Sequence, residues 1–185
     1  MLCLPMVLNF AHKDALGLAA EPLTRELGLT AGQFGLAGSI FFLLFGVAGV
    51  VVGFLGNRVA SSRLLLAIAI AWSVSLGPLL LFPTFATLLL SRLLLGTAEG
   101  PTAPVATHAI HKWFPESRRA LPGAVVFVGA SIGIAVSAPA LTFLIEHHGW
   151  KSAFWSLAIA GLAWSAAWLL IGREGVPREN SGSGQ

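Results

Sequence analysis

Charged residues are scarce in this chain of 185 residues, since Asp, Glu, Lys and Arg together make up only 10% of it. A soluble domain carries roughly a quarter of such residues. Hydrophobic residues make up 56% of the chain. This balance excludes an ordinary water-soluble fold, and it predicts an integral membrane protein.

Cysteine is almost absent as well, because Cys3 is the only one in the sequence. A single cysteine excludes an intramolecular disulfide and a thiolate metal cluster, and we expect neither a metal nor a cofactor. The net charge of +3 is not gathered on one amphipathic face, so nucleic acid is not an expected partner. The apolar start carries no basic leader and no small-residue cleavage pattern, so it is not interpreted as a removable signal.

Long apolar stretches recur along the chain, and strand-type alternation is absent from them. A hydrocarbon core about 30 Å thick is crossed by about 20 helical residues. Backbone groups in lipid must be satisfied within each segment, so these stretches are expected to be helices. The predicted fold is therefore an all-α membrane protein with six transmembrane helices, near residues 2–23, 34–56, 64–82, 85–110, 121–145 and 152–172.

Basic residues indicate how these helices are oriented, because cytoplasmic loops accumulate Lys and Arg. The external side of the predicted topology holds only Arg25 and Lys151. The other side holds seven residues: Arg58, Arg63, Lys112, Arg118, Arg119, Arg173 and Arg178. Both termini are therefore predicted to be cytoplasmic in the plasma (inner) membrane.

Two charged residues lie inside the apolar stretch at 85–110, namely Arg92 and Glu99. A spacing of seven residues places both on one helix face, about 10 Å apart along the axis. Ionisable residues at membrane depth normally face a protein interior or a cavity and mark a substrate path. The alternative is a structural salt bridge between the two side chains.

The first apolar stretch is interrupted by polar residues, beginning with Asn9 and continuing at His12, Lys13 and Asp14. One interpretation places this run at the interfacial end of a short helix. The other places it within the membrane, lining the same polar cavity as Arg92 and Glu99. Glycines form a second pattern, with Gly35, Gly46, Gly49 and Gly53 on one stripe and Gly129 and Gly133 at a G-x-x-x-G spacing, which favours close helix packing.

Several of these segments resemble one transporter family. Residues 92–100 (R-L-L-L-G-T-A-E-G), 113–115 (W-F-P) and 149–154 (G-W-K-S-A-F) are similar to the anion:cation symporter branch of the major facilitator superfamily. N-F-A-H-K at 9–13 occupies the place of that branch's N-Y-x-D-R. G-F-L-G-N-R-V-A-S-S-R at 53–63 resembles the superfamily loop G-x-L-x-D-R-x-G-x-R-R.

The resemblance implies that residues 1–172 form the amino-terminal half of such a transporter, a six-helix domain built as a 3+3 inverted repeat. Residues 173–185 would then be a flexible cytoplasmic tail or the start of a central loop. The expected partners are a small organic anion such as a sugar acid or aromatic acid, a proton, the lipid bilayer and a second six-helix half. That second half would also cover the polar face, which would otherwise meet lipid.

Roles for individual residues follow from the same resemblance. Arg92 is similar to the arginine that engages a substrate carboxylate, with Lys13 and Asn9 as further substrate-binding residues. Glu99 resembles the acidic residue that carries the coupled proton. His12 stands where the family has a carboxylate commonly assigned to proton coupling, so it is grouped with Glu99.

The loop after the second helix also departs from the family pattern. Gly53, Arg58 and Arg63 match conserved positions of a loop involved in conformational change, whereas Asn57 replaces the family's Asp. The charge contacts of that loop are therefore expected to be weaker.

Two hypotheses remain open at this point. Arg92, Glu99 and the W-F-P segment favour transport of an organic anion, with a proton, by a half or truncated transporter. The replacements at His12 and Asn57 favour a non-transporting six-helix membrane protein with a structural role. An enzyme is not expected, because no nucleophile and base lie at a credible spacing.

Overall fold

The computed structural model describes residues 3–55 and 61–171, and every regular element within those ranges is helical. The elements, in chain order, are α1 (Cys3–Leu18), α2 (Ala20–Leu27), α3 (Ala31–Leu55), α4 (Ser61–Ser75), α5 (Gly77–Leu81), α6 (Phe85–Glu99), α7 (Thr102–Trp113), the 3-10 helix η2 (Glu116–Arg118), α8 (Ala120–His148) and α9 (Trp150–Ile171). The predicted all-helical class is therefore confirmed for this part of the chain.

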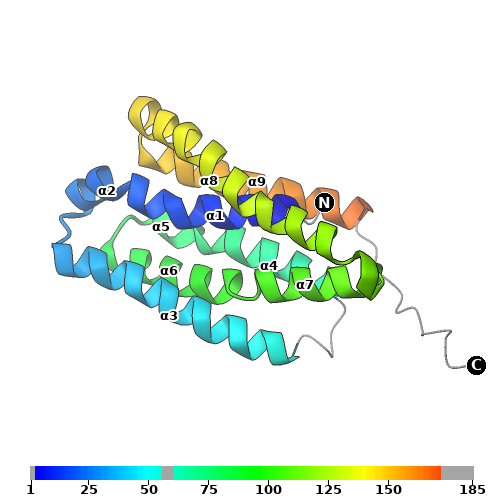
Figure 1. Ribbon diagram of the computed structural model, residues 1–185. Helices are drawn as coiled ribbons and strands as arrows, with labels where there is room; N and C mark the ends of the chain where they lie inside the picture. Colours follow the sequence, from blue (N-terminus) through cyan, green and yellow to red (C-terminus); the bar gives the residue numbers. More distant parts are fainter. Residues whose placement is uncertain (1–2, 56–60, 172–185) are drawn as a thin grey trace, which may run out of the picture.

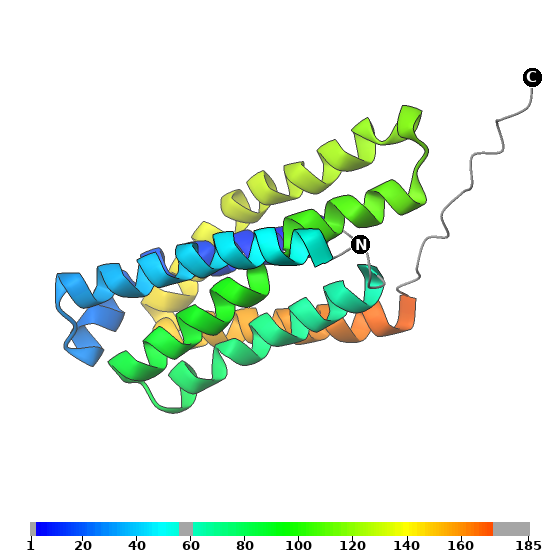
Figure 2. The ribbon, with the colours of Figure 1, turned by 90° about the horizontal axis from the view of Figure 1, so that it is seen from below.

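The long helices run back and forth along one common axis, with their connections at the two ends of the molecule (Figure 1). α1 packs mainly against α8, α3 against α6, and α4 against α9 and α6. Seen from below, α4 and α9 lie side by side while α3 crosses α6 and α7 (Figure 2). The main core lies among these helices and includes the fully buried Trp72, Leu95 and Phe154.

Four of the described helical segments are long and apolar enough to cross a membrane. They are Ala31–Phe54, Ser61–Leu81, Ala120–His148 and Trp150–Ile171. These segments make the chain a multi-pass membrane protein. The other two predicted spans, at 2–23 and 85–110, are each divided into shorter helices.

The predicted single helix over 85–110 is wrong, because it ends at Glu99 and a new helix begins at Thr102. Pro101 has no backbone N–H, so it cannot donate to the carbonyl of Thr97 as a helical residue would. The flanking hydrogen bonds are kept, from Gly100 N to Gly96 O at 3.1 Å and from Val105 N to Pro101 O at 3.0 Å. The chain therefore keeps its direction through an interruption immediately after Glu99.

The first predicted span is divided in the same way, at Ala19 between α1 and α2. Pro22 lies in the first turn of α2, where a missing N–H is tolerated, and it cannot bond the carbonyl of Leu18. α1 continues beyond His12 to Leu18, and His12 is 1% exposed. The interpretation of the polar run as the interfacial end of a short helix is therefore wrong.

Glycines let two helix pairs approach closely, in part as the sequence predicted. A Cβ added at Gly49 of α3 would lie 3.1 Å from the carbonyl oxygen of Gly100, and one at Gly133 of α8 would lie 2.8 Å from that of Val7 in α1. Gly35 and Gly46 have open space at the Cβ position, so they take no part in packing within this chain. Close backbone approach at small residues is how membrane helices gain dispersion contacts without a hydrophobic drive between them.

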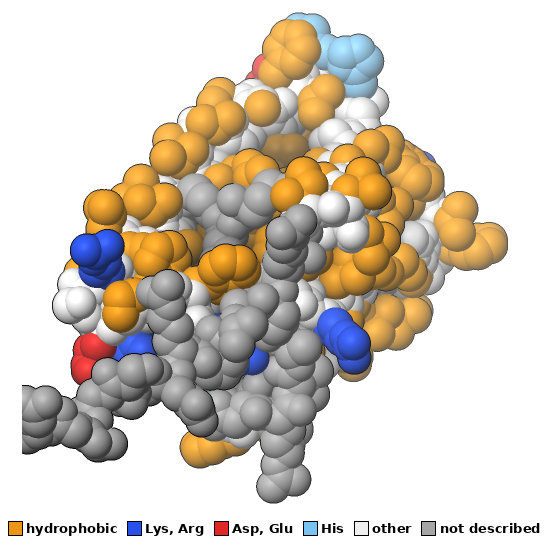
Figure 3. Space-filling model, turned by 90° about the vertical axis from the view of Figure 1, so that its right-hand side faces the viewer, with side chains coloured by type: hydrophobic (Ala, Val, Ile, Leu, Met, Phe, Trp, Pro, Cys, Tyr) orange, Lys and Arg blue, Asp and Glu red, His pale blue; other side chains and the backbone are white. Residues whose placement is uncertain are grey.

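Four basic residues lie at the same end of the molecule: Arg63 in the first turn of α4, Lys112 in the last turn of α7, and Arg118 and Arg119 between α7 and α8 (Figure 1). Figure 3 faces this end and shows Lys and Arg side chains around it among hydrophobic side chains. Arg25 and Lys151 belong to α2 and α9 at the opposite end.

At the opposite end, Glu26 joins α2 to the start of α9. Trp150 Nε1 donates a hydrogen bond to Glu26 Oε2 at 2.6 Å, and Lys151 Nζ lies 2.9 Å from Glu26 Oε1. α8 and α9 are joined there by Gly149 alone, at φ 80, so the connector predicted over 146–151 is shorter than expected. A positive φ of this size suits glycine, which has no Cβ.

Candidate functional site

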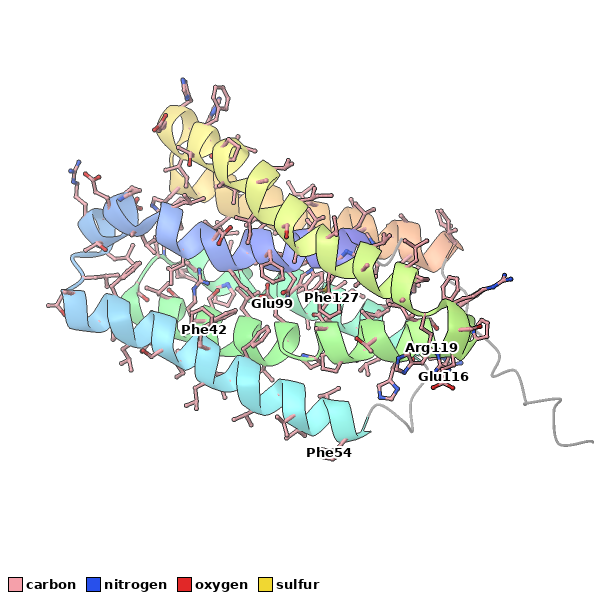
Figure 4. All side chains as sticks on the ribbon, in the orientation of Figure 1. Phe42, Phe54, Glu99, Glu116, Arg119 and Phe127 are labelled. Atoms are coloured by element: carbon pink, nitrogen blue, oxygen red, sulfur yellow. The ribbon has the colours of Figure 1, made fainter. Side chains whose placement is uncertain are left out.

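α6 brings the two predicted charged residues into the interior of the chain. Arg92 is 2% exposed and Glu99 is 0% exposed, and Figure 4 shows Glu99 roughly midway along the molecule. Ser91 anchors the same helix to α4, because its Oγ donates to the carbonyl of Ser75 at 2.7 Å. α3 lies against the other side of α6, where a Cβ at Gly96 or Gly100 would collide with the carbonyls of Phe41 and Phe45.

α1 supplies two residues that contact Glu99. His12 Nδ1 lies 3.3 Å from Glu99 Oε1, and both side chains are fully buried. Asn9, also buried, donates from Nδ2 to the backbone carbonyl of Glu99 at 3.5 Å. The structure thus brings Asn9 and His12 to Glu99, although about ninety positions separate them along the chain.

Arg92 and Glu99 do not form the salt bridge considered from the sequence, since no ion pair joins them in the described residues. The guanidinium instead lies near two aromatic rings, 6.0 Å from the centroid of Phe41 and 5.9 Å from that of Phe154. Its Nε and Nη2 atoms have no hydrogen-bond partner among the described residues. Two strong donors of a buried guanidinium therefore remain available to a ligand.

Lys13 is the second cation of this region, and its side chain is half-buried. Its Nζ atom lies 4.2 Å from the ring centroids of both Phe10 and Phe45. Lys13 and Arg92 are the two cations of this region, and Glu99 and the neighbouring Asp14 are its two acidic residues. These charges affect one another strongly, because charges separated from water interact through a low effective dielectric.

Burial within the chain corrects one expectation. Arg92, Glu99 and His12 do not need a second half to shield them from lipid, because α1, α3, α6 and α9 already enclose them. The sequence alone did not reveal this, since the enclosing residues come from helices that are distant in the sequence.

The predicted conformational loop lies only partly within the described residues. Gly53 lies near the end of α3, where an added Cβ would be 3.8 Å from Pro104 Cβ in α7. Arg63 is exposed in the first turn of α4. Asn57, Arg58 and the tail at 173–185 lie outside the described residues.

The sequence reasoning missed the aromatic residues around the charges. Phe41 and Phe45 are one helical turn apart on α3, and this spacing was a usable signal in the F-F-L-L-F run at 41–45. The Trp72 ring centroid lies 5.8 Å from that of His12, a contact that no local pattern indicates. No group of three or more His, Cys, Asp or Glu side chains suited to a metal ion occurs among the described residues.

Comparison with known proteins identifies the family. The Major Facilitator Superfamily model matches residues 2–185. The chain belongs to the major facilitator superfamily. Members of this superfamily are transporters and not enzymes, in agreement with the expectation from the sequence.

Several relatives within the superfamily are named for small organic acids, although one of similar identity, from Arabidopsis thaliana, is named a sodium-dependent phosphate transport protein. The chain is 30% identical over 168 residues to the hexuronate transporter of Bacillus subtilis, covering 91% of this chain and 40% of that protein. It is 29% identical to a probable L-galactonate transporter of Escherichia coli (90% and 37% covered). It is also 25% identical to a probable sulfoacetate transporter of Cupriavidus necator (89% and 38% covered). The chain thus spans about 40% of the length of these transporters.

Solved facilitator structures share the same fold. A bacterial homologue of the human lysosomal transporter Spinster, inward-facing and occupied, superimposes with a TM-score of 0.86 at 22% identity, covering 98% of this chain and 45% of that one. A proton:xylose symporter superimposes with a TM-score of 0.72 at 15% identity, covering 94% and 44%. At these identities the likeness shows the fold alone.

Proposed function

We propose that this chain is the amino-terminal half of an organic anion transporter coupled to protons. The observation that carries the proposal is the buried Arg92 guanidinium, whose Nε and Nη2 donors lack partners in the described residues. A planar guanidinium binds a carboxylate through two parallel charge-assisted hydrogen bonds. Leaving such donors unpaired in an interior is unfavourable, so an incoming carboxylate would find the site already organised.

The substrate class is a small organic acid. Three relatives are named for hexuronate, L-galactonate and sulfoacetate, which share an acidic group on a small polar skeleton. Arg92 would bind the acidic group, Lys13 would add a second positive charge, and Asn9 would contribute an amide near Glu99. The two cations Arg92 and Lys13 suit a substrate that carries at least one negative charge.

Proton coupling is assigned to Glu99 together with His12. The 3.3 Å approach of His12 Nδ1 to Glu99 Oε1 would let the pair take up one proton, although neither atom has a hydrogen-bond partner among the described residues. The family motif that residues 9–13 resemble has Asp at the position of His12. Anion binding near Arg92 places a second negative charge close to Glu99. That charge favours protonation of the pair, which would couple entry of the anion to entry of a proton.

The architecture assigned to the complete transporter is two six-helix halves with the substrate between them. In this chain, α1–α2 and α6–α7 would be two further, interrupted spans beside the four candidate spans, of which Ser61–Leu81 itself consists of α4 and α5. Together they would give a 3+3 domain over residues 1–172. Interrupted helices are typical of substrate sites near the middle of the bilayer. The second half would provide the opposing wall for alternating access.

Orientation is proposed from the distribution of basic residues, with both termini on the cytoplasmic side of the inner membrane. A periplasm-active reporter fused after Gly149 should be active, and one fused after Arg119 should be inactive. The reverse result would overturn this orientation.

Substitution of Arg92 tests the function directly, in membranes that contain the chain together with its second half. We expect Arg92→Ala to abolish binding of D-glucuronate, and Arg92→Lys to bind it poorly because the paired geometry is lost. Arg25→Ala is the matched control, since Arg25 forms only an exposed pair with Glu21 at the end of the molecule. Unchanged affinity in Arg92→Ala would contradict the assignment, and a wild-type protein that binds no acid would favour the non-transporting alternative.

A further inference from the structure

Two phenylalanines of α3 lie one turn apart and contact the two cations of the site. The ring centroids of Phe41 and Phe45 are 5.9 Å apart. The Phe41 centroid is 6.0 Å from the Arg92 Cζ, and the Phe45 centroid is 4.2 Å from the Lys13 Nζ. One helix therefore places an aromatic ring at each cation.

A second ring from another helix accompanies each of these contacts. Phe154 of α9 is fully buried and lies 5.9 Å from the Arg92 guanidinium. Phe10 of α1 lies 4.2 Å from Lys13 Nζ. Each cation thus has two aromatic neighbours, and in each case one of the two rings belongs to α3.

The face of an aromatic ring can stabilise a cation while no anion is bound to it. Among the described residues, neither the buried Arg92 nor the half-buried Lys13 forms an ion pair. A buried cation without a paired carboxylate is unfavourable. The negative face of a ring stabilises the cation without taking its hydrogen-bond donors. A carboxylate side chain at the same place would occupy those donors and would compete with the substrate.

We propose that Phe41 and Phe45 form an aromatic clamp on α3 that positions Arg92 and Lys13 for an acidic substrate. Phe154 and Phe10 complete the clamp from α9 and α1. The consequence for substrate binding rests on the proposed function, whereas the positioning of the two cations does not. Because both rings belong to one helix, a movement of α3 against α6 and α1 would shift both anchors together.

The positioning is tested by resonance spectroscopy of the full chain in lipid nanodiscs. The sequence contains only three lysines, Lys13, Lys112 and Lys151, so isotope-labelled dimethyl groups on them give few signals. The Lys13 signal should be displaced by the ring currents of Phe10 and Phe45. Phe45→Leu should reduce that displacement and Phe45→Tyr should retain it, while Phe54→Leu serves as a control because Phe54 is 82% exposed at the end of α3 (Figure 4).

The effect on binding is tested with trifluorophenylalanine at position 41 or 45, in the chain assembled with its second half. Fluorine removes the negative ring face while nearly keeping the shape of the side chain, so a packing role alone would leave affinity unchanged. We expect D-glucuronate affinity to fall about tenfold for each clamp position and not at all for position 54. An unmoved Lys13 signal in Phe45→Leu, or unchanged affinity after fluorination, would overturn the clamp.

The two proposals fail in different ways. If the wild-type assembly binds no D-glucuronate, the proposed substrate class is wrong, and the Lys13 signal still decides whether the rings position the cation. If D-glucuronate binds and fluorination has no effect, the clamp is wrong and the substrate assignment stands.

Discussion

At the scale of single residues, the contact between Glu99 and His12 lies where the sequence departs from the motif that it resembles. That motif, N-Y-x-D-R, has Asp at the position of His12, and two buried carboxylates would repel one another when both are ionised. A neutral histidine 3.3 Å from Glu99 Oε1 avoids that repulsion, although neither His12 Nδ1 nor Glu99 Oε1 has a hydrogen-bond partner among the described residues.

A side chain at position 99 that cannot bind a proton should abolish proton coupling and leave anion binding intact. In Glu99→Gln the side chain keeps its shape and cannot titrate, so we expect anion binding and anion exchange to persist while uptake loses its dependence on the proton gradient. Uptake into vesicles that contain the chain assembled with its second half, with and without an imposed gradient, measures this. Glu116→Gln is the matched control, because Glu116 is exposed near Arg119 at the end of the molecule (Figure 4). Gradient-dependent uptake by Glu99→Gln would exclude Glu99 as the coupling residue.

A second residue-scale prediction concerns Glu26. Hydrogen bonds from Lys151 and Trp150 hold the pKa of Glu26 below its ordinary value of 4.5. Because the pKa of Glu26 is lowered in the folded state, its contribution to the free energy of unfolding is complete above the ordinary pKa. That contribution is lost as the pH falls through the pKa of the folded state. Because both side chains of the Lys151 pair are 44% exposed, the expected contribution is only about 0.5 kcal/mol.

Glu26→Gln should therefore lower the Tm near neutral pH by about 1–2 °C, and the difference should vanish in acid well below the ordinary pKa of a glutamate. Thermal unfolding in detergent at both pH values measures the effect. Glu21→Gln, which removes an exposed pair with Arg25, should change the Tm at neither pH. A Tm loss for Glu26→Gln that is equal in acid would show that packing, not charge, is responsible.

At the scale of helices, glycine packing between α3 and α6 fixes where the site residues meet. A Cβ at Gly96 would collide with the Phe41 carbonyl, so the two backbones touch beside Arg92. The interruption at Pro101 follows directly after Glu99. α6 is therefore held on one side by α3 and ends where its acidic residue contacts α1.

Gly96→Ala should destabilise the chain by about 1–3 kcal/mol, because a backbone carbonyl cannot move aside as a flexible side chain would. Gly46→Ala on α3 is the matched control, since nothing lies within 4 Å of its Cβ position, and it should be neutral or slightly stabilising. Thermal unfolding of both variants in the same detergent tests this. Equal Tm values for the two would contradict the close contact between α3 and α6.

At the scale of the whole molecule, the chain holds the charged residues but spans only about 40% of its relatives. Arg92, Glu99 and His12 are buried by the chain's own helices, whereas Lys13 is only half-buried. Under the proposed function, a second half is required because alternating access needs one half to move against another around the substrate.

The purified chain reconstituted alone into vesicles should therefore show no proton-driven uptake of organic anions. Addition of a second six-helix half in the same membrane should establish uptake. Uptake by the chain alone, abolished by Glu99→Gln, would instead establish a transporter assembled from copies of this chain.

The sequence by itself determined the helical class, the membrane environment and the identity of the charged residues. These properties follow from composition and local spacing, which do not depend on contacts between segments. The helix breaks at Ala19 and Pro101 were also predictable from the sequence, because the missing N–H of Pro22 or Pro101 removes a hydrogen bond within its own turn. The predicted uninterrupted helices relied on the length of the apolar stretches alone.

Only the tertiary structure decided which charges meet. Helical spacing put Arg92 and Glu99 on one face, yet Glu99 contacts His12 and Asn9 of α1, while Arg92 lies by Phe41 and Phe154. Spacing within one helix cannot fix these partners, because they depend on how helices distant in the sequence pack together. Backbone contacts at Gly49 and Gly96 hold α3 against α6, and one at Gly133 holds α8 against α1.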